Sequence, residues 1–507
     1  MLDGLGNPSY GMQAIGPIGG IYNEGMSSVV AVERAVPHVE PLAGLTAWEA
    51  CRRLADQRRL LFLDSATQGG ELARYSFVTA DPATWLTSHH GWISENGRFA
   101  GVADPIHLLR NRLAEFPLEP IEGLPPFQGG VAGLFSYDLC HHVEVLPQPI
   151  YNDFGIPDLA VGIYDWVLAF DHATDDAWLI STGYPEADPR RREIRARQRA
   201  DEIERLLTRT TAPLPARIDD AGLNVETPQF PIDGLPGITS NFDRDRYFET
   251  IRRAIEYVYA GDCFQVNIAQ RLLTQASLTP LDLYERLRTR NPAPFAGFFD
   301  LGDHTIISAS PERFLRVENG EVETRPIKGT RPRGKTPAED QRFADELLAS
   351  AKDQAENVMI VDLLRNDLGR VCEYGSVRVE ALCRLESYRF VHHLVSEVRG
   401  RLRGDCGPTD LLRAAFPGGS VTGAPKIRAM EIITELEQTS RGPYCGSLGY
   451  IGFDGSMDTS LLIRTFVMSN GWLHFSVGGG IVADSTPERE YDETWHKAAG
   501  LLRALAD

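Results

Sequence analysis

A short cationic segment around Lys328 contains the residue types that covalent catalysis needs. It reads Pro326-Ile327-Lys328-Gly329-Thr330-Arg331-Pro332-Arg333-Gly334, so two prolines and two glycines shape the backbone around one lysine. Four further cations flank that lysine: Arg325, Arg331, Arg333 and Lys335. Their positive potential favours a neutral, nucleophilic amine at Lys328 and would attract an anionic substrate. A solvated basic hairpin end is the alternative for this segment alone.

Glu312 is the candidate acid for the same site. Asn319-Gly320 is a strong type I′ turn signal between strands expected over 313–317 and 321–324. Folding about that turn pairs residue 318 with 321 and brings Glu312 beside residue 327, next to Lys328. Strict alternation places the two side chains on opposite faces, so a shared site needs a bulge or a twist at Pro326. A buried Glu312 could act as a general acid, and the alternative is an ordinary surface ion pair.

Three carboxylates are candidates for a metal site. Glu356 lies on the apolar side of an expected helix, where a cation must face it, and arginine is the commonest such partner. Ser485-Thr486-Pro487-Glu488 predicts a capping box, and the helix that it opens places Glu490, Glu493 and Lys497 on one face. Oxygen donors without histidine or thiol favour Mg²⁺ over zinc. An exposed charged helix is the alternative.

Two glycine-rich segments could bind a carboxylate through backbone amides. Val477–Ile481 precedes the last helix, and Pro417–Lys426, which contains Thr422 and Gly423, leads into a helix expected over 427–436. The segment Pro417–Lys426 matches neither a P-loop nor a GxGxxG motif, so neither ATP nor NAD is indicated. Three more polar residues are open to a binding or a structural role: Tyr444, Arg464 and His393, the last interpreted first as a core histidine.

Composition narrows the class of protein. A net charge of −19 argues against a nucleic-acid partner, because phosphate binding needs a surplus of cations. No apolar run reaches the ~18 residues of a membrane helix, and no signal peptide is apparent. The seven cysteines are scattered without CxxC pairs, which is typical of reduced thiols in a cytoplasmic protein.

The organisation along the chain predicts an α/β (α+β) fold. Residues 1–36 are expected to be a loose extension, 37–210 an α+β region, and 211–239 a proline-rich linker. A catalytic domain is expected over 240–507, opening with a helix capped within 240–243, ended by Gly261 and followed by a strand over 263–273.

Taken together, these segments resemble the chorismate-utilising enzyme family over roughly residues 240 to 500. Five motifs in order carry the resemblance: Ser310–Phe314, Pro326–Arg331, Asn357–Asp367, Gly423–Lys426 and Pro487–Thr494. The family implies a large two-subdomain sheet sandwich with helices outside, Mg²⁺ as cofactor and chorismate as substrate. By motif position it implies Glu356 and Glu493 as metal ligands, with Glu490 bound directly or through water. The substrate contacts that it implies are Arg464, Tyr444, Thr422, Gly423, Gly478, Gly480, Lys497, His393, Thr330 and Gln265.

Two positions discriminate within the family. Relatives that add water to chorismate carry a lysine base where this sequence has Gln265, so ammonia is the expected nucleophile. Relatives that make anthranilate resemble Pro-Ile-Ala-Gly-Thr where this sequence has Lys328. The resemblance therefore implies attack of Lys328 at C2 while Glu312 helps the C4 hydroxyl to leave, then addition of ammonia at C4 to give 4-amino-4-deoxychorismate.

The resemblance also implies partners. No glutaminase segment is apparent, so ammonia is expected from a separate glutamine amidotransferase subunit. Leu61–Ser65 and Arg74–Phe77 resemble a tryptophan-binding region, although Asp64 stands where glutamate is usual, which disfavours regulation by tryptophan. Three alternatives stay open: an anthranilate-forming member of the family, a Schiff-base aldolase that uses Lys328, and a non-catalytic subunit that binds an aromatic amino acid.

Overall fold

Two antiparallel sheets dominate the structure, a computed structural model that describes residues 34–67, 71–209, 225–389 and 391–506. Central strands such as β8 (Leu159–Tyr164) are buried along their whole length because both faces are covered. One buried cluster contains Leu61 and Phe77 from one sheet and Ala132 and Leu134 from the other. The sheets therefore pack face to face, as a sandwich does.

The first sheet has 13 strands. Their order is β1 (His38–Leu42), β10 (Asp176–Ser181), β9 (Trp166–Asp171), β3 (Tyr75–Thr79), β2 (Leu61–Asp64), β14 (Phe295–Asp300), β15 (His304–Ser310), β24 (Thr465–Ser469), β25 (Trp472–Ile481), β13 (Gln265–Gln275), β12 (Thr239–Ser240) and β11 (Phe230–Pro231). The short strand β21 (Gly423–Ala424) pairs with β13.

The second sheet has 12 strands. Their order is β18 (Ile327–Pro332), β20 (Val391–Arg401), β17 (Glu321–Thr324), β16 (Arg313–Glu318), β23 (Met457–Leu461), β22 (Ser447–Gly452), β7 (Gly130–Phe135), β8, β4 (Thr84–His89), β5 (Trp92–Glu95) and β6 (Arg98–Val102). The strands β17 and β18 pair with successive parts of one edge of β20, and β19 (Arg378–Ser387) pairs with its other edge.

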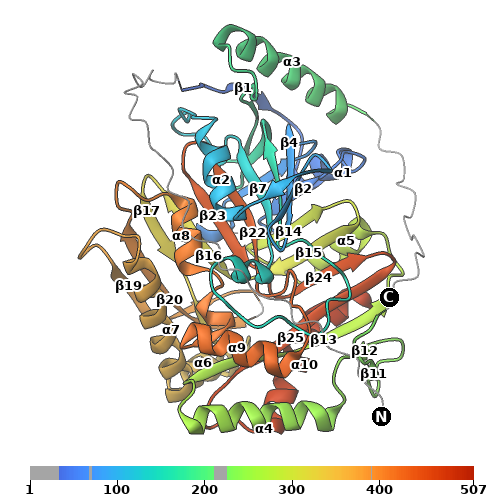
Figure 1. Ribbon diagram of the computed structural model, residues 1–507, viewed down its shortest axis with the longest axis vertical. Coiled ribbons are helices and arrows are strands. Elements are labelled where there is room, and N and C mark those ends of the chain that lie inside the picture. Colours follow the sequence, from blue (N-terminus) through green and yellow to red (C-terminus); the bar gives the residue numbers. More distant parts are fainter. Residues whose placement is uncertain (1–33, 68–70, 210–224, 390, 507) are drawn as a thin grey trace, which may run out of the picture. The chain divides into compact units, whose positions relative to one another are not determined.

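Helices cover the outer faces of the sandwich (Figure 1). The first sheet carries α1 (Ala47–Arg53), α3 (Pro189–Leu207), α4 (Arg244–Ala260), α5 (Pro280–Arg290), α9 (Lys426–Glu437) and α10 (Pro487–Leu505), whose apolar residues join its clusters. The second carries α2 (Pro105–Ala114), α6 (Pro337–Leu348), α7 (Ala351–Gly369) and α8 (Pro408–Ala415). Three short 3₁₀ turns are η1 (Glu71–Ala73), η2 (Tyr137–His142) and η3 (Gly419–Val421). The expected sandwich with helices outside is confirmed.

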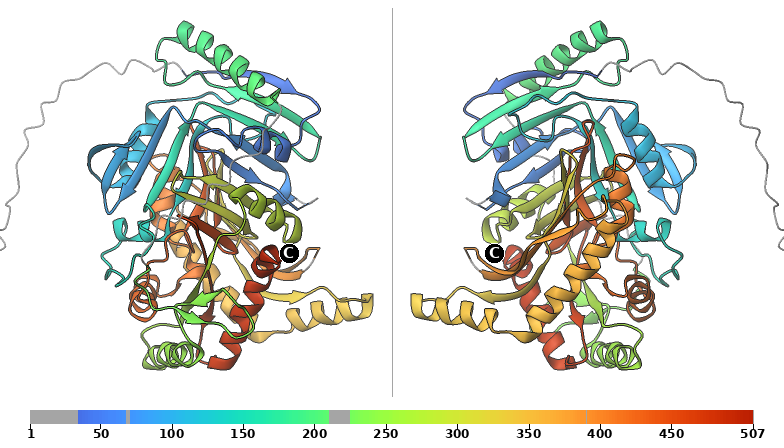
Figure 2. Two further views of the ribbon diagram at one scale, coloured as in Figure 1. Left: turned by 90° about the vertical axis from the view of Figure 1, so that its right-hand side faces the viewer. Right: turned by 90° about the vertical axis from the view of Figure 1, so that its left-hand side faces the viewer.

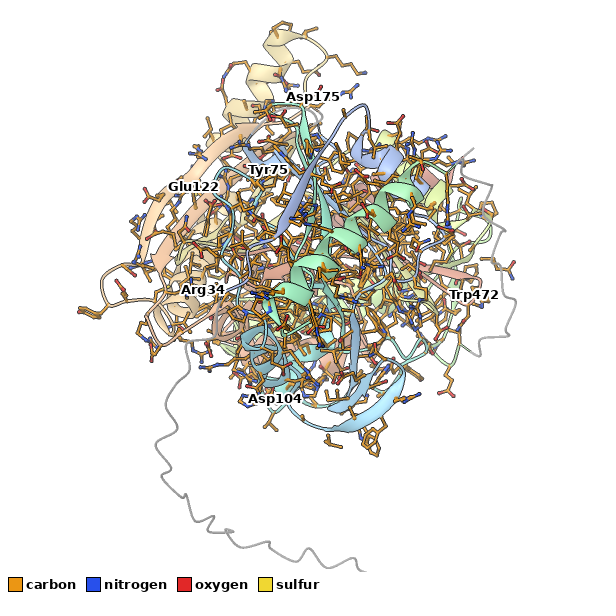
Figure 3. All side chains as sticks on the ribbon, turned by 90° about the horizontal axis from the view of Figure 1, so that it is seen from above. Arg34, Tyr75, Asp104, Glu122, Asp175 and Trp472 are labelled. Carbon is orange, nitrogen blue, oxygen red and sulfur yellow. The ribbon has the colours of Figure 1, made fainter. Side chains whose placement is uncertain are left out.

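Two packing relationships between helices and sheets are visible from several sides. The helices α4 and α10 lie side by side at one end of the molecule (Figures 1 and 2). At the other end α3 crosses over the edge formed by β1 and β10, as the view from above shows (Figure 3). None of the described helices is long and apolar enough to span a bilayer.

The regions predicted over 37–210 and 240–507 share both sheets. The first sheet alternates strands from the two regions, since β2 pairs with β14, and the second joins β7 to β22. Residues from Arg34 onward therefore form one compact unit instead of two. Most of the extension expected over 1–36 and much of the linker lie outside the described residues, and the rest of the linker contributes β11 and the start of β12.

Local predictions in the site region mostly hold. The hairpin turn has Asn319 at φ 52° and Gly320 at φ 79°, and residue 318 pairs with 321 as expected. Helix α4 begins after Asp243, whose side chain accepts from the Arg246 amide, and ends at Gly261. The predicted capping box at Ser485 is wrong, because Thr486 is the N-cap residue of α10 and its side chain accepts no hydrogen bond from a helix amide.

Candidate active site

Lys328 lies on β18 at a bulge. The pairing of β18 with β20 shifts register between Lys328 and Thr330, and Gly329 between them has φ 80°. A side chain there would be 2.9 Å from Leu347, so glycine is required on steric as well as conformational grounds. The bulge reorients the lysine, and this is the irregularity that a site shared with Glu312 needs.

Glu312 and Lys328 meet at Ser420 on η3. The Ser420 hydroxyl donates to Oε1 of Glu312 at 2.8 Å, and the Ser420 carbonyl accepts from Nζ of Lys328 at 3.1 Å. Glu312 is buried, and desolvation raises its pKa to about 7 against the opposing effects of Ser420 and Lys328. At neutral pH a large fraction of Glu312 is therefore a carboxylic acid that can donate a proton.

The pKa of Lys328 is lowered, but for a different reason from the one that the sequence indicates. Burial is the main cause, and Lys497 adds to it, while Glu356 and Glu312 oppose it. The neighbouring arginines are neutralised: Arg325 pairs with Glu386 and Glu397, Arg331 with Asp353, and Arg333 with Asp340. The cationic loop is thus a set of ion pairs, and desolvation makes the amine more nucleophilic.

The three predicted metal ligands come together from α7 and α10. The Lys352 amine lies 3.8 Å from Glu356 and 3.9 Å from Glu490, so one cation touches both carboxylates. An added Cβ at Gly479 would lie 3.1 Å from a Glu490 oxygen and 3.4 Å from a Glu493 oxygen. The predicted arginine partner of Glu356 is therefore a lysine, and glycine at 479 lets both α10 carboxylates approach β25.

Burial shapes the ionisation of these acids. Desolvation raises the pKa of Glu356 and of Glu490. It acts in the same direction on Glu493, yet the pKa of Glu493 is lowered because Lys497 lies 2.7 Å from its carboxylate. Lys497 also donates to the Gly478 carbonyl at 2.8 Å, which fixes its amine at the site.

The donor set fits Mg²⁺ in its chemistry. The set consists of carboxylate oxygens and contains no thiol or imidazole. The pKa values of Glu356 and Glu490 are raised, and a cation bound nearby would lower them. In the described ranges no three His, Cys, Asp or Glu side chains are arranged closely enough to hold a metal ion as they stand. Glu356, Glu490 and Glu493 would have to approach one another to hold an ion, and the amine of Lys352 lies 3.8 Å from Glu356 and 3.9 Å from Glu490 in its place.

The glycine-rich segments pack against β13. Gly423 has φ 147° and lies so close to the Gln265 carbonyl that a Cβ would be 2.1 Å from it. The Thr422 hydroxyl donates to the Gly418 carbonyl at 3.0 Å, so it can offer only its lone pairs to a ligand. Gly478 and Gly480 lie against β13 in the same way, with no room for side chains.

Gln265 is buried at the end of β13. Neither its amide nitrogen nor its amide oxygen has a hydrogen-bond partner among the described residues. The amide group points at Gly480, whose added Cβ would be 2.5 Å from the Gln265 nitrogen. An unpaired buried amide is costly, so it is well suited to a polar ligand.

The remaining predicted contacts gather around His393. Thr330 Oγ1 lies 2.9 Å from Nδ1 of His393, and burial together with the Arg464 charge lowers the pKa of His393 to about 4. Arg464 donates to the Lys497 carbonyl at 2.7 Å, and burial lowers its pKa to about 10, with Tyr444 opposing. The structure thus brings the predicted substrate residues into one region, with His393 both buried and neutral.

The sequence did not predict the roles that four groups have at the site: Ser420, Lys352, Ser485 and the buried Glu437–Arg441 pair. Ser485 donates to Glu490 at 2.6 Å instead of capping α10. Arg441 pairs with Glu437 at 2.6 Å and donates to the carbonyls of Val421 and Asn267, which ties η3 to β13. A serine next to Gly419 in the glycine-rich turn was the one available signal for Ser420.

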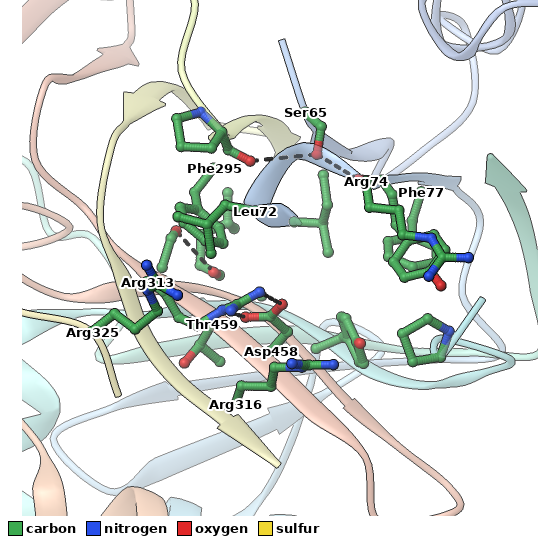
Figure 4. A pocket seen from close by; sticks show the side chains of 18 of the residues that line it. Ser65, Leu72, Arg74, Phe77, Phe295, Arg313, Arg316, Arg325, Asp458 and Thr459 are labelled. Carbon is green, nitrogen blue, oxygen red and sulfur yellow. Dashed lines mark hydrogen bonds and ion pairs between the residues drawn. The ribbon is translucent and has the colours of Figure 1, made fainter. Parts of the chain in front are cut away.

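A separate cavity of ≈ 480 Å³ lies between the sheets (Figure 4). Ser65 is on one side, and Arg313, Arg316 and Arg325 lie on the other. Asp64 belongs to its lining, but its carboxylate is taken up by Arg288 and Tyr284 at 2.9 and 2.8 Å. The two segments expected to bind tryptophan therefore border one cavity, which neither Lys328 nor Glu312 lines.

Known proteins resemble this chain in sequence and in fold. The family model for chorismate binding enzyme matches residues 60–503. Aminodeoxychorismate synthase component 1 of Salmonella typhimurium is 45% identical over 436 residues, covering 85% of this chain and 90% of that protein. Anthranilate synthase component 1 of Thermus thermophilus is 43% identical over 453 residues, covering 89% and 94%. The crystal structure of anthranilate synthase component I from Streptococcus pneumoniae has a TM-score of 0.71 and 33% identity, covering 85% of this chain and 92% of that one. Sequence and fold together show that this chain belongs to the family of chorismate-binding enzymes.

Proposed function

We propose that this protein makes 4-amino-4-deoxychorismate from chorismate and ammonia, the reaction of an aminodeoxychorismate synthase component 1. The product would enter para-aminobenzoate and folate synthesis in the cytoplasm. The observation that carries the proposal is the pairing of Lys328 and Glu312 at Ser420. An amine with a lowered pKa beside an acid with a raised pKa is suited to adding a nucleophile while expelling a hydroxyl.

The first step uses both residues. Nζ of Lys328 forms a bond to C2 of chorismate and loses a proton, the two ring double bonds shift, and the C4–O bond breaks. Glu312 gives its proton to the departing hydroxyl, which leaves as water, and its carboxylate then takes up the proton that Nζ of Lys328 loses. The burial of Glu312 supports this role, because an exposed glutamate would be ionised at neutral pH.

The second step reverses the shift. Ammonia forms a bond to C4, the ring double bonds return, and the C2–N bond to Lys328 breaks. The nitrogen now on C4 loses one proton and the departing Lys328 amine gains one, a transfer that Glu312 would relay. Gln265 supports ammonia over water as the nucleophile, because its amide is a poor base for activating water. A glutamine amidotransferase subunit would supply the ammonia, and a high concentration of ammonium should replace it.

Residues around Lys328 would orient the substrate. Arg464 offers a cation to a carboxylate of chorismate, while Tyr444, Thr330 and neutral His393 offer hydrogen bonds. Glu356, Glu490 and Glu493 would hold Mg²⁺, which when bound neutralises a substrate carboxylate. Gly423, Gly478 and Gly480 pack directly against β13, and their backbone groups would be the ones that contact the substrate.

Anthranilate formation is the second candidate, because the Thermus thermophilus relative of that name is 43% identical. Lys328 favours the para product, since without a lysine adduct at C2 ammonia itself would attack C2. The cavity next to Ser65 is a candidate site for tryptophan. Because Asp64 is already paired with Arg288, it lacks a free carboxylate for the amino group, and we expect weak binding without inhibition.

Product analysis tests the proposal. The protein is incubated with chorismate, Mg²⁺ and ammonium, and the products are identified by mass and by the fluorescence of anthranilate. Wild type and Lys335→Ala, which changes an exposed lysine of the same segment, should make 4-amino-4-deoxychorismate. Lys328→Ala should lose that product by a factor on the order of 10³ and can release some anthranilate. An unchanged product from Lys328→Ala would refute the proposal.

A further inference from the structure

We propose that Ser420 is a positioning residue that orients the carboxyl group of Glu312 for departure of the C4 hydroxyl. The inference rests on the proposed function and assigns a task to a residue outside the motif positions discussed above. Ser420 is buried, and its hydroxyl donates to Oε1 of Glu312 at 2.8 Å. A hydrogen bond at one oxygen leaves the other oxygen to carry the proton toward the substrate.

The turn that carries Ser420 is held from several sides. Arg441 donates to the Val421 carbonyl at 3.1 Å, and the Thr422 hydroxyl donates to the Gly418 carbonyl at 3.0 Å. Gly419 lies directly against Leu363 of α7, since an added Cβ would be 2.5 Å from that side chain. The hydroxyl of Ser420 therefore starts from a fixed backbone, which a positioning role requires.

The two contacts of Ser420 can be separated experimentally. Its contact with Lys328 uses the main-chain carbonyl and survives any side-chain substitution. Its contact with Glu312 uses the side chain and is lost in Ser420→Ala. Ser420→Thr keeps a hydroxyl on the same carbon. The alanine variant thus removes the support of the acid while leaving that of the nucleophile.

The test is a double-mutant cycle measured by chorismate consumption. Ser420→Ala should lower kcat by about 10- to 100-fold with less than about a twofold change in KM, because the free carboxyl group loses its orientation. Ser420→Thr should restore kcat to within about threefold of wild type. In a Glu312→Gln background Ser420→Ala should have no further effect, since the group that it positions is absent.

A control separates positioning from general loss of a buried hydroxyl. Thr79 on β3, in the other sheet, is also buried and donates to the Trp166 carbonyl at 2.6 Å, so Thr79→Val should keep the wild-type kcat. The inference is overturned if Ser420→Ala keeps the wild-type kcat, if its effect multiplies with that of Glu312→Gln, or if Thr79→Val is equally impaired. Product identity is measured separately: anthranilate from wild type would refute the proposed function yet leave the role of Ser420 testable, because both products require loss of the C4 hydroxyl.

Discussion

The amine of Lys352 lies 3.8 Å from the carboxylate of Glu356, one turn further along α7. The same amine is 3.9 Å from Glu490 on α10. Half of the Lys352 side chain is exposed, so it can swing away into solvent. Lys352 therefore behaves as a replaceable cation at the carboxylates that would hold Mg²⁺.

Removing Lys352 should strengthen Mg²⁺ binding. Lys352→Ala eliminates a competing positive charge, and the Mg²⁺ concentration that gives half-maximal activity should fall by about threefold. Bound metal is removed with EDTA, and activity is then measured as Mg²⁺ is added back to find the concentration that gives half-maximal activity. Lys335→Ala, which removes a lysine outside the site, is the control. Weaker Mg²⁺ binding by Lys352→Ala would show that the lysine supports the metal site.

Replacing Gln265 with an apolar residue should raise the stability of the protein and lower its activity. The buried amide of Gln265 has no hydrogen-bond partner among the residues that the structure describes, whereas that of Gln270 on the same strand donates to Thr494 at 2.8 Å and accepts from Ser240 at 2.9 Å. Gln265→Met should raise the free energy of unfolding by about 1 kcal/mol and lower kcat/KM by about tenfold, while Gln270→Met should destabilise by about 1–3 kcal/mol. Urea unfolding and steady-state kinetics measure these quantities. Equal destabilisation by both would mean that the Gln265 amide is satisfied in solution.

Local sequence signals predicted the strand pairing that brings Glu312 and Lys328 together. The Asn319-Gly320 turn fixed the pairing of β16 with β17, and this register brings Glu312 near Lys328. The five motifs predicted the family and therefore the sandwich. Turn chemistry and periodicity act over a few residues, so such predictions succeed where the contact is local.

Contacts between distant segments could not be predicted in the same way. Ser420 is 108 residues from Glu312 and 92 from Lys328 along the chain. The sequence predicts that the flanking arginines lower the pKa of Lys328, yet acids from elsewhere in the chain, such as Glu386 and Asp353, neutralise them. Ser485 matched a capping box, but Thr486 is the N-cap residue, and the Ser485 hydroxyl accepts from the Val482 amide and donates to Glu490.

Gly329 should be required for catalysis, unlike a glycine of the same conformation elsewhere. Gly329 has φ 80° and Gly320 has φ 79°, so alanine strains both by about 1–2 kcal/mol. Only at Gly329 would the methyl group approach Asp353 and Leu347 within 3.0 Å, whereas Gly320 has open space. Gly329→Ala should lower kcat by more than about tenfold and Gly320→Ala should retain it, as steady-state assays at matched folded fractions can show. Equal kcat values for the two variants would contradict a catalytic role for the bulge.

The raised pKa of Glu312 should make activity and stability depend on pH in linked ways. The pKa is about 7 in the folded protein against an ordinary value of 4.5, so the folded state holds a proton that the unfolded chain releases between these values. The contribution of this group to stability is present below about pH 4.5 and is lost as pH rises through about 7, on the order of 3 kcal/mol in total. Activity should also fall as the pH rises through about 7, because the ionised carboxylate cannot protonate the departing hydroxyl.

Glu312→Gln separates these effects. Glutamine cannot ionise, so this variant should exceed wild type in its free energy of unfolding by less than about 1 kcal/mol at pH 5 and by about 3 kcal/mol at pH 8, although its kcat should be lower by about 100-fold or more. Urea unfolding at the two pH values gives the stability difference, and Glu318→Gln, on the exposed end of β16, is the matched control. A difference in unfolding free energy that stays constant between pH 5 and pH 8 would mean that Glu312 is ionised in the folded protein. The acid for the C4 hydroxyl would then have to be another group.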